Sequence, residues 1–200
     1  MKKTLTVLLA LVLVIAMSVA GTMAYLTSTD EVVNSFTVGK VAITLDEAKV
    51  DVYGKPDAAA TARVDKNEYK LIPGHSYTKD PTIHVAADSE DCYLFVKVED
   101  GLTAIEADKT IATQLAEKNW KPVDNVANVY VYAVGDAAKT IVPASKSVTD
   151  VPVFGSFTLT GTADVSTYAN AQIKVTAYAI QADGFAEKTP AVIWGDAGFT

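Results

Sequence analysis

The sequence predicts a mainly β protein: a single antiparallel β-sandwich of jelly-roll type with one or two short helices, preceded by a helical signal peptide. Three observations lead to this prediction. Apolar residues recur at every second position in six to eight separate segments, which is the period of a β-strand. One interior segment has the period of a helix instead, and glycine and proline interrupt the others at irregular spacing. This combination is typical of antiparallel sandwiches and jelly rolls.

The first residues have the layout of a secretory signal peptide. Lys2 and Lys3 precede a stretch, residues 4–29, that contains no charged side chain and is centred on Leu, Val, Ile and Ala. A basic start, an apolar core and small residues afterwards define such signals. A retained membrane anchor is the alternative, but a spanning helix needs ~20 apolar residues. The run reaches that length only by including polar residues beyond Ala20, so we favour cleavage.

Two bonds fit the small-x-small rule for this cleavage. A cut after Ala20 would leave Gly21 as the new N-terminus, and a cut after Ala24 would leave Tyr25. Local sequence rules do not choose between them. With the second cut, the chain divides into a signal peptide, residues 1–24, and one β-sandwich domain, residues 25–200. A domain of that length can bury a core without disulfides.

The first predicted strand covers residues 35–45. Phe36 and Val38 share one face, and after Gly39 the apolar phase moves to Val41 and the alternate residues that follow it. A change of phase at a glycine within a strand predicts a bulge or a tight bend. Residues 46–70 are polar and rich in alanine, and predict a long surface excursion with room for one edge strand.

A β-hairpin is predicted for residues 83–98. Ile83 and Val85 mark its first strand, residues 88–91 form an acidic turn, and residues 92–98 form its second strand. The chain's single cysteine, Cys92, begins that second strand in phase with apolar residues, so we expect it to pack as a small core residue. A disulfide with another chain is the alternative.

Residues 108–118 form the predicted helix, with Ile105, Ile111 and Leu115 on one apolar stripe. Two strands follow, at residues 128–134 and at residues 150–161, the second with a bulge position at Gly155.

Residues 172–180 are apolar or aromatic on both faces, which predicts a central strand covered on two sides. One turn of helix is predicted at residues 191–194.

No catalytic, cofactor or metal site is predicted. A zinc-protease helix needs two histidines four positions apart, whereas His75 and His84 are nine apart with Pro81 between them. The residues between Ala87 and Cys92 include three carboxylates, of the kind that bind calcium. They lack the loop pattern with a central glycine, so we interpret them as a solvated turn.

The remaining sequence favours a protein that is not an enzyme. Ser156 follows a glycine but lacks the second glycine of a nucleophile elbow, and no strand leads into a phosphate-binding glycine loop. The formal net charge of −7 and the absence of a basic stripe argue against nucleic acid as a partner. Contact with a membrane is expected only through the uncleaved signal peptide.

Three stretches of the chain follow the pattern of a known group of exported proteins. The first is "GTMAYLTSTDEVVNSFTVGKVAITLDE", in which Gly21 to Ala24 precede an aromatic residue at Tyr25. The others are "LIPGHSYTKDPTIHVAADSEDCYLFVKV" and "IKVTAYAIQADGF". Together they cover about 70 of the 200 positions and resemble the TasA/camelysin family of bacterial exported proteins.

The resemblance implies a jelly-roll-like sandwich and cleavage after Ala24 by a SipW-type signal peptidase. It also implies assembly into fibres of the extracellular biofilm matrix, in some members by an N-terminal strand lent to the neighbouring subunit. Residues 25–38 would be that strand, with Tyr25, Leu26, Phe36 and Val38 as candidate assembly residues. Camelysins have been classed as metalloproteases, an activity that the resemblance does not bring here because the sequence contains no His-Glu-x-x-His.

We therefore expect a secreted structural protein of the bacterial cell surface or biofilm matrix. Its partners would be further copies of itself or other matrix proteins, and a SipW-type peptidase during export. A monomeric surface module that binds a glycan or a host protein is the alternative, and a secreted camelysin-type peptidase comes third.

Overall fold

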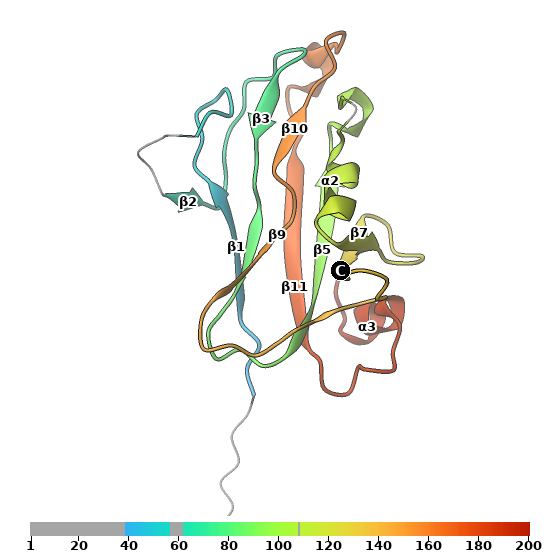
Figure 1. Cartoon of the computed structure of the whole chain (residues 1–200). Coiled ribbons are helices and arrows are strands. Elements are labelled where there is room, and N and C mark those ends of the chain that lie inside the picture. Colours follow the sequence, from blue (N-terminus) through green and yellow to red (C-terminus); the bar gives the residue numbers. More distant parts are fainter. Residues whose placement is uncertain (1–38, 57–61, 108) are drawn as a thin grey trace, which may run out of the picture. The chain divides into compact units, whose positions relative to one another are not determined.

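Two antiparallel β-layers face each other in the structure, a computed structural model that describes residues 39–56, 62–107 and 109–200 (Figure 1). The first layer has the strand order β2-β1-β4-β9. Its strands are β2 (Arg63–Val64), β1 (Ile43–Ala48), β4 (Thr82–Val85) and β9 (Thr149–Pro152). The mainly β sandwich predicted from the periodicity is confirmed.

The second layer has the strand order β11-β5-β7-β6, and β8 also pairs with β5. Its strands are β11 (Ile173–Gln181), β5 (Cys92–Asp100), β7 (Val129–Tyr132), β6 (Trp120–Pro122) and β8 (Ile141–Val142). The long β5 joins the layer together, because β11 pairs along one of its edges and β7 and β8 share the other.

A two-stranded sheet, β3 (Ser76–Thr78) with β10 (Ser156–Thr158), extends the first layer. The junction is bridged by backbone hydrogen bonds from Val153 N to Pro81 O (2.9 Å) and from Lys79 N to Gly155 O (3.2 Å). The strand predicted at residues 150–161 is therefore two short strands, β9 and β10. The interruption lies at the predicted bulge position, Gly155.

The main core lies between the layers. Its largest fully buried side chains are Trp120, Tyr77, Phe154, Phe157, Ile83 and Leu94. Cys92 belongs to the same core, is 0% exposed and is a free thiol, and burial raises its pKa to about 11. The predicted core role of this cysteine is confirmed.

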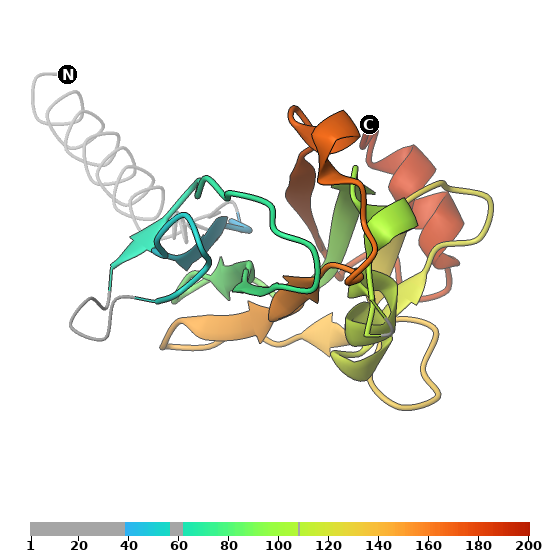
Figure 2. The ribbon, with the colours of Figure 1, turned by 90° about the horizontal axis from the view of Figure 1, so that it is seen from above.

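A second core covers the opposite face of the five-stranded layer. Helix α3 (Pro190–Asp196) packs there, and Figure 2 shows it on the side of that layer away from β1. Thr189 caps the helix by accepting a hydrogen bond from Val192 N, and Pro190 occupies its first turn, where a missing N–H costs nothing. The predicted turn of helix at residues 191–194 is confirmed.

Helix α2 (Ile111–Glu117) begins after its N-cap Thr110, inside the predicted residues 108–118. The predicted apolar stripe is buried, with Ile111 and Leu115 at 2% and 1% exposure. Two short 3-10 helices complete the described elements, η1 (Thr103–Ile105) and η2 (Val165–Tyr168). Among the described residues, no helix combines the length and the apolar character needed to cross a membrane.

The predicted hairpin at residues 83–98 is wrong. β4 pairs with β1 and β9, whereas β5 pairs with strands of the other layer, so residues 86–91 cross between the layers. The backbone of this crossing binds other segments: Asp88 N donates to Ser145 O (2.8 Å) and Glu90 N to Lys40 O (3.0 Å). Alternation identifies strands but does not tell whether a short turn returns along one sheet or arches to a second.

The central position predicted for residues 172–180 is also wrong. Both faces of β11 are covered, by the main core and by the second core. Within the described residues, however, β11 pairs with β5 alone and is the edge of its layer.

The first strand, predicted for residues 35–45, differs as well. Residues 35–38 lie outside the described residues, residues 39–42 belong to no strand, and β1 begins at Ile43. It continues to Ala48 through Asp46 and Glu47, whose charged side chains contact neighbouring segments.

Gln114 fastens α2 to the interruption between β9 and β10. Its side chain is buried, its Oε1 accepts from the backbone N–H groups of Gly155 (3.1 Å) and Ser156 (3.2 Å), and its Nε2 donates to Ser156 O (2.8 Å). Gln114→Ala should lower the free energy of unfolding by about 2–4 kcal/mol, because buried backbone groups lose their partners and a cavity remains.

Urea denaturation measures this change. Glu117→Gln on the exposed side of the same helix is the matched control, and should change stability by less than ~0.5 kcal/mol. Equal losses in both variants would contradict the role assigned to Gln114.

Candidate functional site

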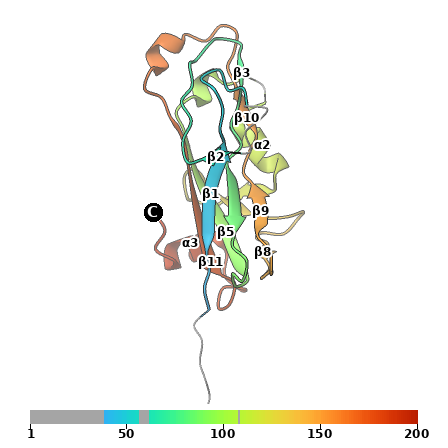
Figure 3. The same cartoon turned by 90° about the vertical axis from the view of Figure 1, so that its left-hand side faces the viewer.

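A groove lies along one side of the sandwich, between β1 and β11. These two strands contact each other across the layers, and Figure 3 looks onto this side of the described residues. The groove holds ≈ 990 Å³. Its lining comes mainly from residues 45–47 of β1, residues 173–175 of β11, residues 65–71 and residues 168–172.

Both strands that border the groove have an open edge within the described residues. β11 is hydrogen-bonded to β5 on one edge and to no described strand on the other. β1 pairs with β4 along one edge, while the short β2 pairs with it on the other edge only at Glu47 and Ala48. An open strand edge presents unpaired backbone N–H and C=O groups, which are a template for a further strand.

The groove exposes part of the main core. Leu45, Leu71, Ile173 and Val175 line it and pack against buried core residues, yet each remains partly accessible. Phe157 lies at the same lining and is 1% exposed. The lining is mixed, but these accessible apolar side chains lie between two open edges, which favours an occupant with an extended backbone and alternating apolar side chains.

One wall of the groove contains a buried polar cluster. Glu47 is 4% exposed, and its Oε2 lies 2.5 Å from Lys79 Nζ. Its Oε1 accepts from the backbone N (3.1 Å) and the side-chain Nδ2 (3.0 Å) of Asn67. Tyr69 lies next to the cluster; burial first, and then the charge of Glu47, raise the pKa of its hydroxyl. The carboxylate of Glu47 therefore links β1 to Asn67, which precedes residues 70–76, and to Lys79, which follows them.

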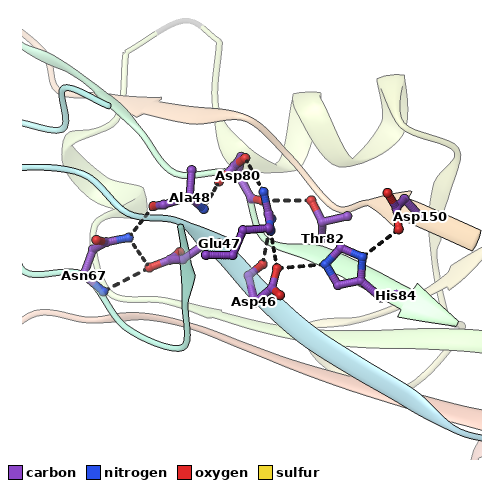
Figure 4. A network of polar contacts seen from close by, with 9 residues as sticks. Asp46, Glu47, Ala48, Asn67, Asp80, Thr82, His84 and Asp150 are labelled. Carbon is purple, nitrogen blue, oxygen red and sulfur yellow. Dashed lines mark hydrogen bonds and ion pairs between the residues drawn. The ribbon is translucent and has the colours of Figure 1, made fainter. Parts of the chain in front are cut away.

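A second set of charges crosses the outer face of the first layer (Figure 4). His84 on β4 contacts two carboxylates: Nε2 lies 2.8 Å from Asp46 Oδ1, and Nδ1 lies 2.6 Å from Asp150 Oδ1. A neutral imidazole has one N–H, so only the protonated ring can donate to both. Arg63 on β2 extends the set, because it contacts both Asp46 and Asp80.

The pKa values of this set follow from the contacts. Partial burial alone would lower the pKa of His84, but the hydrogen bonds to Asp150 and Asp46 outweigh it and raise that pKa above its usual value. Partial burial alone would raise the pKa of Asp46, but Arg63 and His84 together hold it below its usual value. When it is protonated, the ring therefore links β1, β4 and β9.

Several residues singled out in the sequence can now be placed. The predicted cleavage residues Ala24 and Tyr25 lie outside the described residues, as do Leu26, Phe36 and Val38 of the candidate assembly strand.

The two histidines have different partners, since His75 Nε2 lies 2.9 Å from Tyr53 O whereas His84 lies between two carboxylates. In the part of the chain that the structure describes, no three His, Cys, Asp or Glu side chains gather as a metal site. In the acidic turn, Asp91 Oδ1 accepts from Ala144 N (2.5 Å).

Sequence reasoning missed both the groove and its polar cluster. Glu47, Asn67 and Tyr69 belong to residues 46–70, for which the sequence predicts a surface excursion, and Lys79 precedes the predicted hairpin. The available signal is that Glu47 continues the phase of Ile43 and Leu45 beyond the end of the predicted strand, because a carboxylate on a buried face requires a partner. The sequence does not indicate which lysine supplies it.

Comparison of the chain with protein-family models, with curated proteins and with solved structures found no significant match.

His84→Gln tests the charged link across the first layer. The raised pKa of the folded state means that the stabilisation is complete below the unfolded value of ~6.5 and is lost as the pH rises through the folded value. The stability advantage of the natural protein over the variant should therefore shrink by about 1 kcal/mol between pH 5.5 and pH 9.

Urea denaturation at each pH measures that difference. Glu106, whose pKa is raised to about 7 by burial first and then by Asp100, also titrates in this range. It does so in both proteins and cancels from the comparison. A difference in stability that does not change with pH would mean that the ring is not held in its protonated form.

Proposed function

We propose that this protein is a secreted structural protein of the bacterial cell surface or biofilm matrix. It assembles into fibres when the N-terminal segment of one copy, residues 25–38, enters the groove of the next copy. The observation that carries the proposal is the groove between β1 and β11, which combines two open strand edges with partly accessible apolar side chains of the main core.

The length and the chemistry of the segment suit the open edge of β11 and the groove at one end of that strand. β11 has 9 residues, which span ~30 Å at the rise of a β-strand, and residues 173–175 of it line the groove. Residues 25–38 would extend over ~45 Å by the same rise. The segment begins with five uncharged residues and ends in Phe36, Thr37 and Val38, so apolar side chains alternate near its end. Strand addition satisfies the backbone of the edge while the side chains fill the floor.

Export supplies the free end that this assembly needs. In the proposed sequence of events, a SipW-type signal peptidase cuts after Ala24 and releases Tyr25 as the new N-terminus. Support comes from the signal-like layout of residues 1–24 and from the resemblance to TasA/camelysin proteins. Before the cut, the same segment would be tethered to the membrane and unable to reach a neighbouring subunit.

A binding module for a glycan is the second candidate. The observation that favours it is the mixed lining of the groove, where Tyr69 and Tyr168 lie among the amide side chains of Asn67, Asn170 and Gln172. Aromatic rings with a few placed polar groups are typical of small-ligand sites. We do not propose a camelysin-type peptidase activity, since His75 and His84 contact separate partners.

Fibre formation is tested with the purified protein that begins at Tyr25. We expect filaments by electron microscopy, and mass spectrometry of the filament subunits should identify Tyr25 as the first residue. Val175→Glu places a charge on the groove floor and should reduce the filament yield at least tenfold, because burying an unpaired charge costs several kcal/mol. Thr176→Glu is the matched control on the opposite face of β11, where it lies across from Lys97 and should assemble normally.

Deletion of residues 25–38 separates the alternatives. The proposal requires the shortened protein to stay monomeric in analytical ultracentrifugation. Filaments formed without this segment would exclude its insertion as the assembly step. A monomer at high concentration that binds a cell-wall glycan saturably, with or without residues 25–38, would favour the binding module.

A further inference from the structure

Three side chains in the groove wall have an arrangement that strand docking does not require. An amine, an amide and a carboxylate meet at Glu47, whose Oε2 contacts Lys79 Nζ at 2.5 Å and whose Oε1 contacts Asn67 Nδ2 at 3.0 Å. The two oxygens of one carboxylate thus hold a potential nucleophile and a potential electrophile as neighbours on the same carboxyl group. Glu47, Asn67 and Lys79 come from three separate segments of the chain.

The site is sheltered from water. The side chain of Glu47 is 6% exposed and that of Lys79 is 11% exposed. Tyr69 packs beside them, with its ring centroid 5.2 Å from Phe157 and 5.7 Å from Tyr77. The contact between Lys79 Nζ and Glu47 Oε2 is direct, so a proton can pass between the two groups without a bridging water.

The amide of Asn67 is held in a fixed orientation. Its Oδ1 accepts a hydrogen bond from Val50 N (3.0 Å), and its Nδ2 donates to Ala48 O (2.8 Å) as well as to Glu47. The donor at Oδ1 polarises the carbonyl and would stabilise negative charge that develops on that oxygen. The contacts at Nδ2 place the leaving nitrogen against the carboxylate that can supply its proton.

We propose that Lys79 and Asn67 form an intramolecular isopeptide bond, with Glu47 as the catalytic acid and base. Glu47 takes a proton from the Lys79 ammonium, and the free amine attacks Asn67 Cγ. The carbonyl electron pair moves to Oδ1, beside Val50 N–H, and returns as the Cγ–Nδ2 bond breaks. Glu47 passes this proton to Nδ2, and a second proton moves from the attacking nitrogen, through Glu47, to the same leaving group. Nδ2 therefore departs as one ammonium ion, and Nζ keeps a single hydrogen in the new amide. The charge balances, and no oxidant, reductant or cofactor takes part.

The bond would join Asn67, which precedes residues 70–76, to Lys79, which lies between β3 and β4. A covalent link of this kind limits the freedom of the unfolded chain. It would also hold Asn67 and Lys79 in place in the wall of the groove, next to Glu47 of β1. The inference is independent of the proposed fibre function, because the bond forms within one copy of the chain.

Peptide mass spectrometry of the purified, folded protein tests the bond. Trypsin should release residues 67–70 joined to residues 71–97, because an acylated Lys79 is not cleaved. The joined peptide should weigh about 17 Da less than the sum of its parts, the mass of one ammonia. Recovery of free peptides 67–70 and 71–79 in full amount, from protein incubated for days after folding, would overturn the proposal and leave an ordinary buried ion pair.

Substitutions test the roles proposed for Lys79 and Glu47. Lys79→Arg and Glu47→Gln keep similar side-chain sizes but remove the nucleophile and the base, so each should retain the ammonia and unfold at a lower Tm. Lys174→Gln is the matched control, since Lys174 also lines the groove but is 64% exposed and pairs with Glu99. It should form the bond at the natural rate. If Glu47→Gln forms the bond as fully as the natural protein, Glu47 is not the catalytic acid and base. If a variant fails to fold, mass spectrometry of the natural protein still shows whether the bond exists.

Discussion

The sandwich depends on how its two sides are closed. On the side of β9 and β6, the indole of Trp120 donates to Pro152 O (3.0 Å), and Gln114 binds the backbone between β9 and β10. On the side of β1 and β11, the described residues contain no strand that covers both open edges. Partly accessible core residues such as Leu45 and Val175 therefore line a groove. Both the proposed assembly and the proposed isopeptide bond concern this second side.

Charged residues position β1, the strand that forms the wall of the groove. On its outer face, Asp46 contacts Arg63 and His84, which join it to β2 and β4. On its inner face, Glu47 contacts Lys79 and Asn67. Two consecutive carboxylates in a strand point to opposite faces, so one residue links neighbouring strands while the next organises the interior. The interruption of the apolar pattern at Asp46 thus marks the strand's most connected residues rather than its end.

Much of the fold could be predicted from periodicity, because burial of one face imposes it directly. The stripe of Ile105, Ile111 and Leu115 identified α2, and alternation identified β7 and β11. Pairing could not be predicted in the same way, because alternation predicts a hairpin where the chain crosses between β4 and β5, and a central strand where β11 is an edge. The cluster at Glu47 was not found, since strand register and a loop bring Asn67 and Lys79 to it from distant positions. The expectations for Ala24, Tyr25 and residues 26–38 remain predictions.

Hydrogen–deuterium exchange of the protein that begins at Tyr25, compared between monomer and filament, tests the central claim most directly. If a strand of another copy occupies the groove, amides of β11 and of residues 43–45 should exchange at least tenfold more slowly in the filament, because their open edges become hydrogen-bonded. Amides of β7, which already pair on both edges, should change little. Filaments whose β11 amides exchange as fast as those of the monomer would contradict the account.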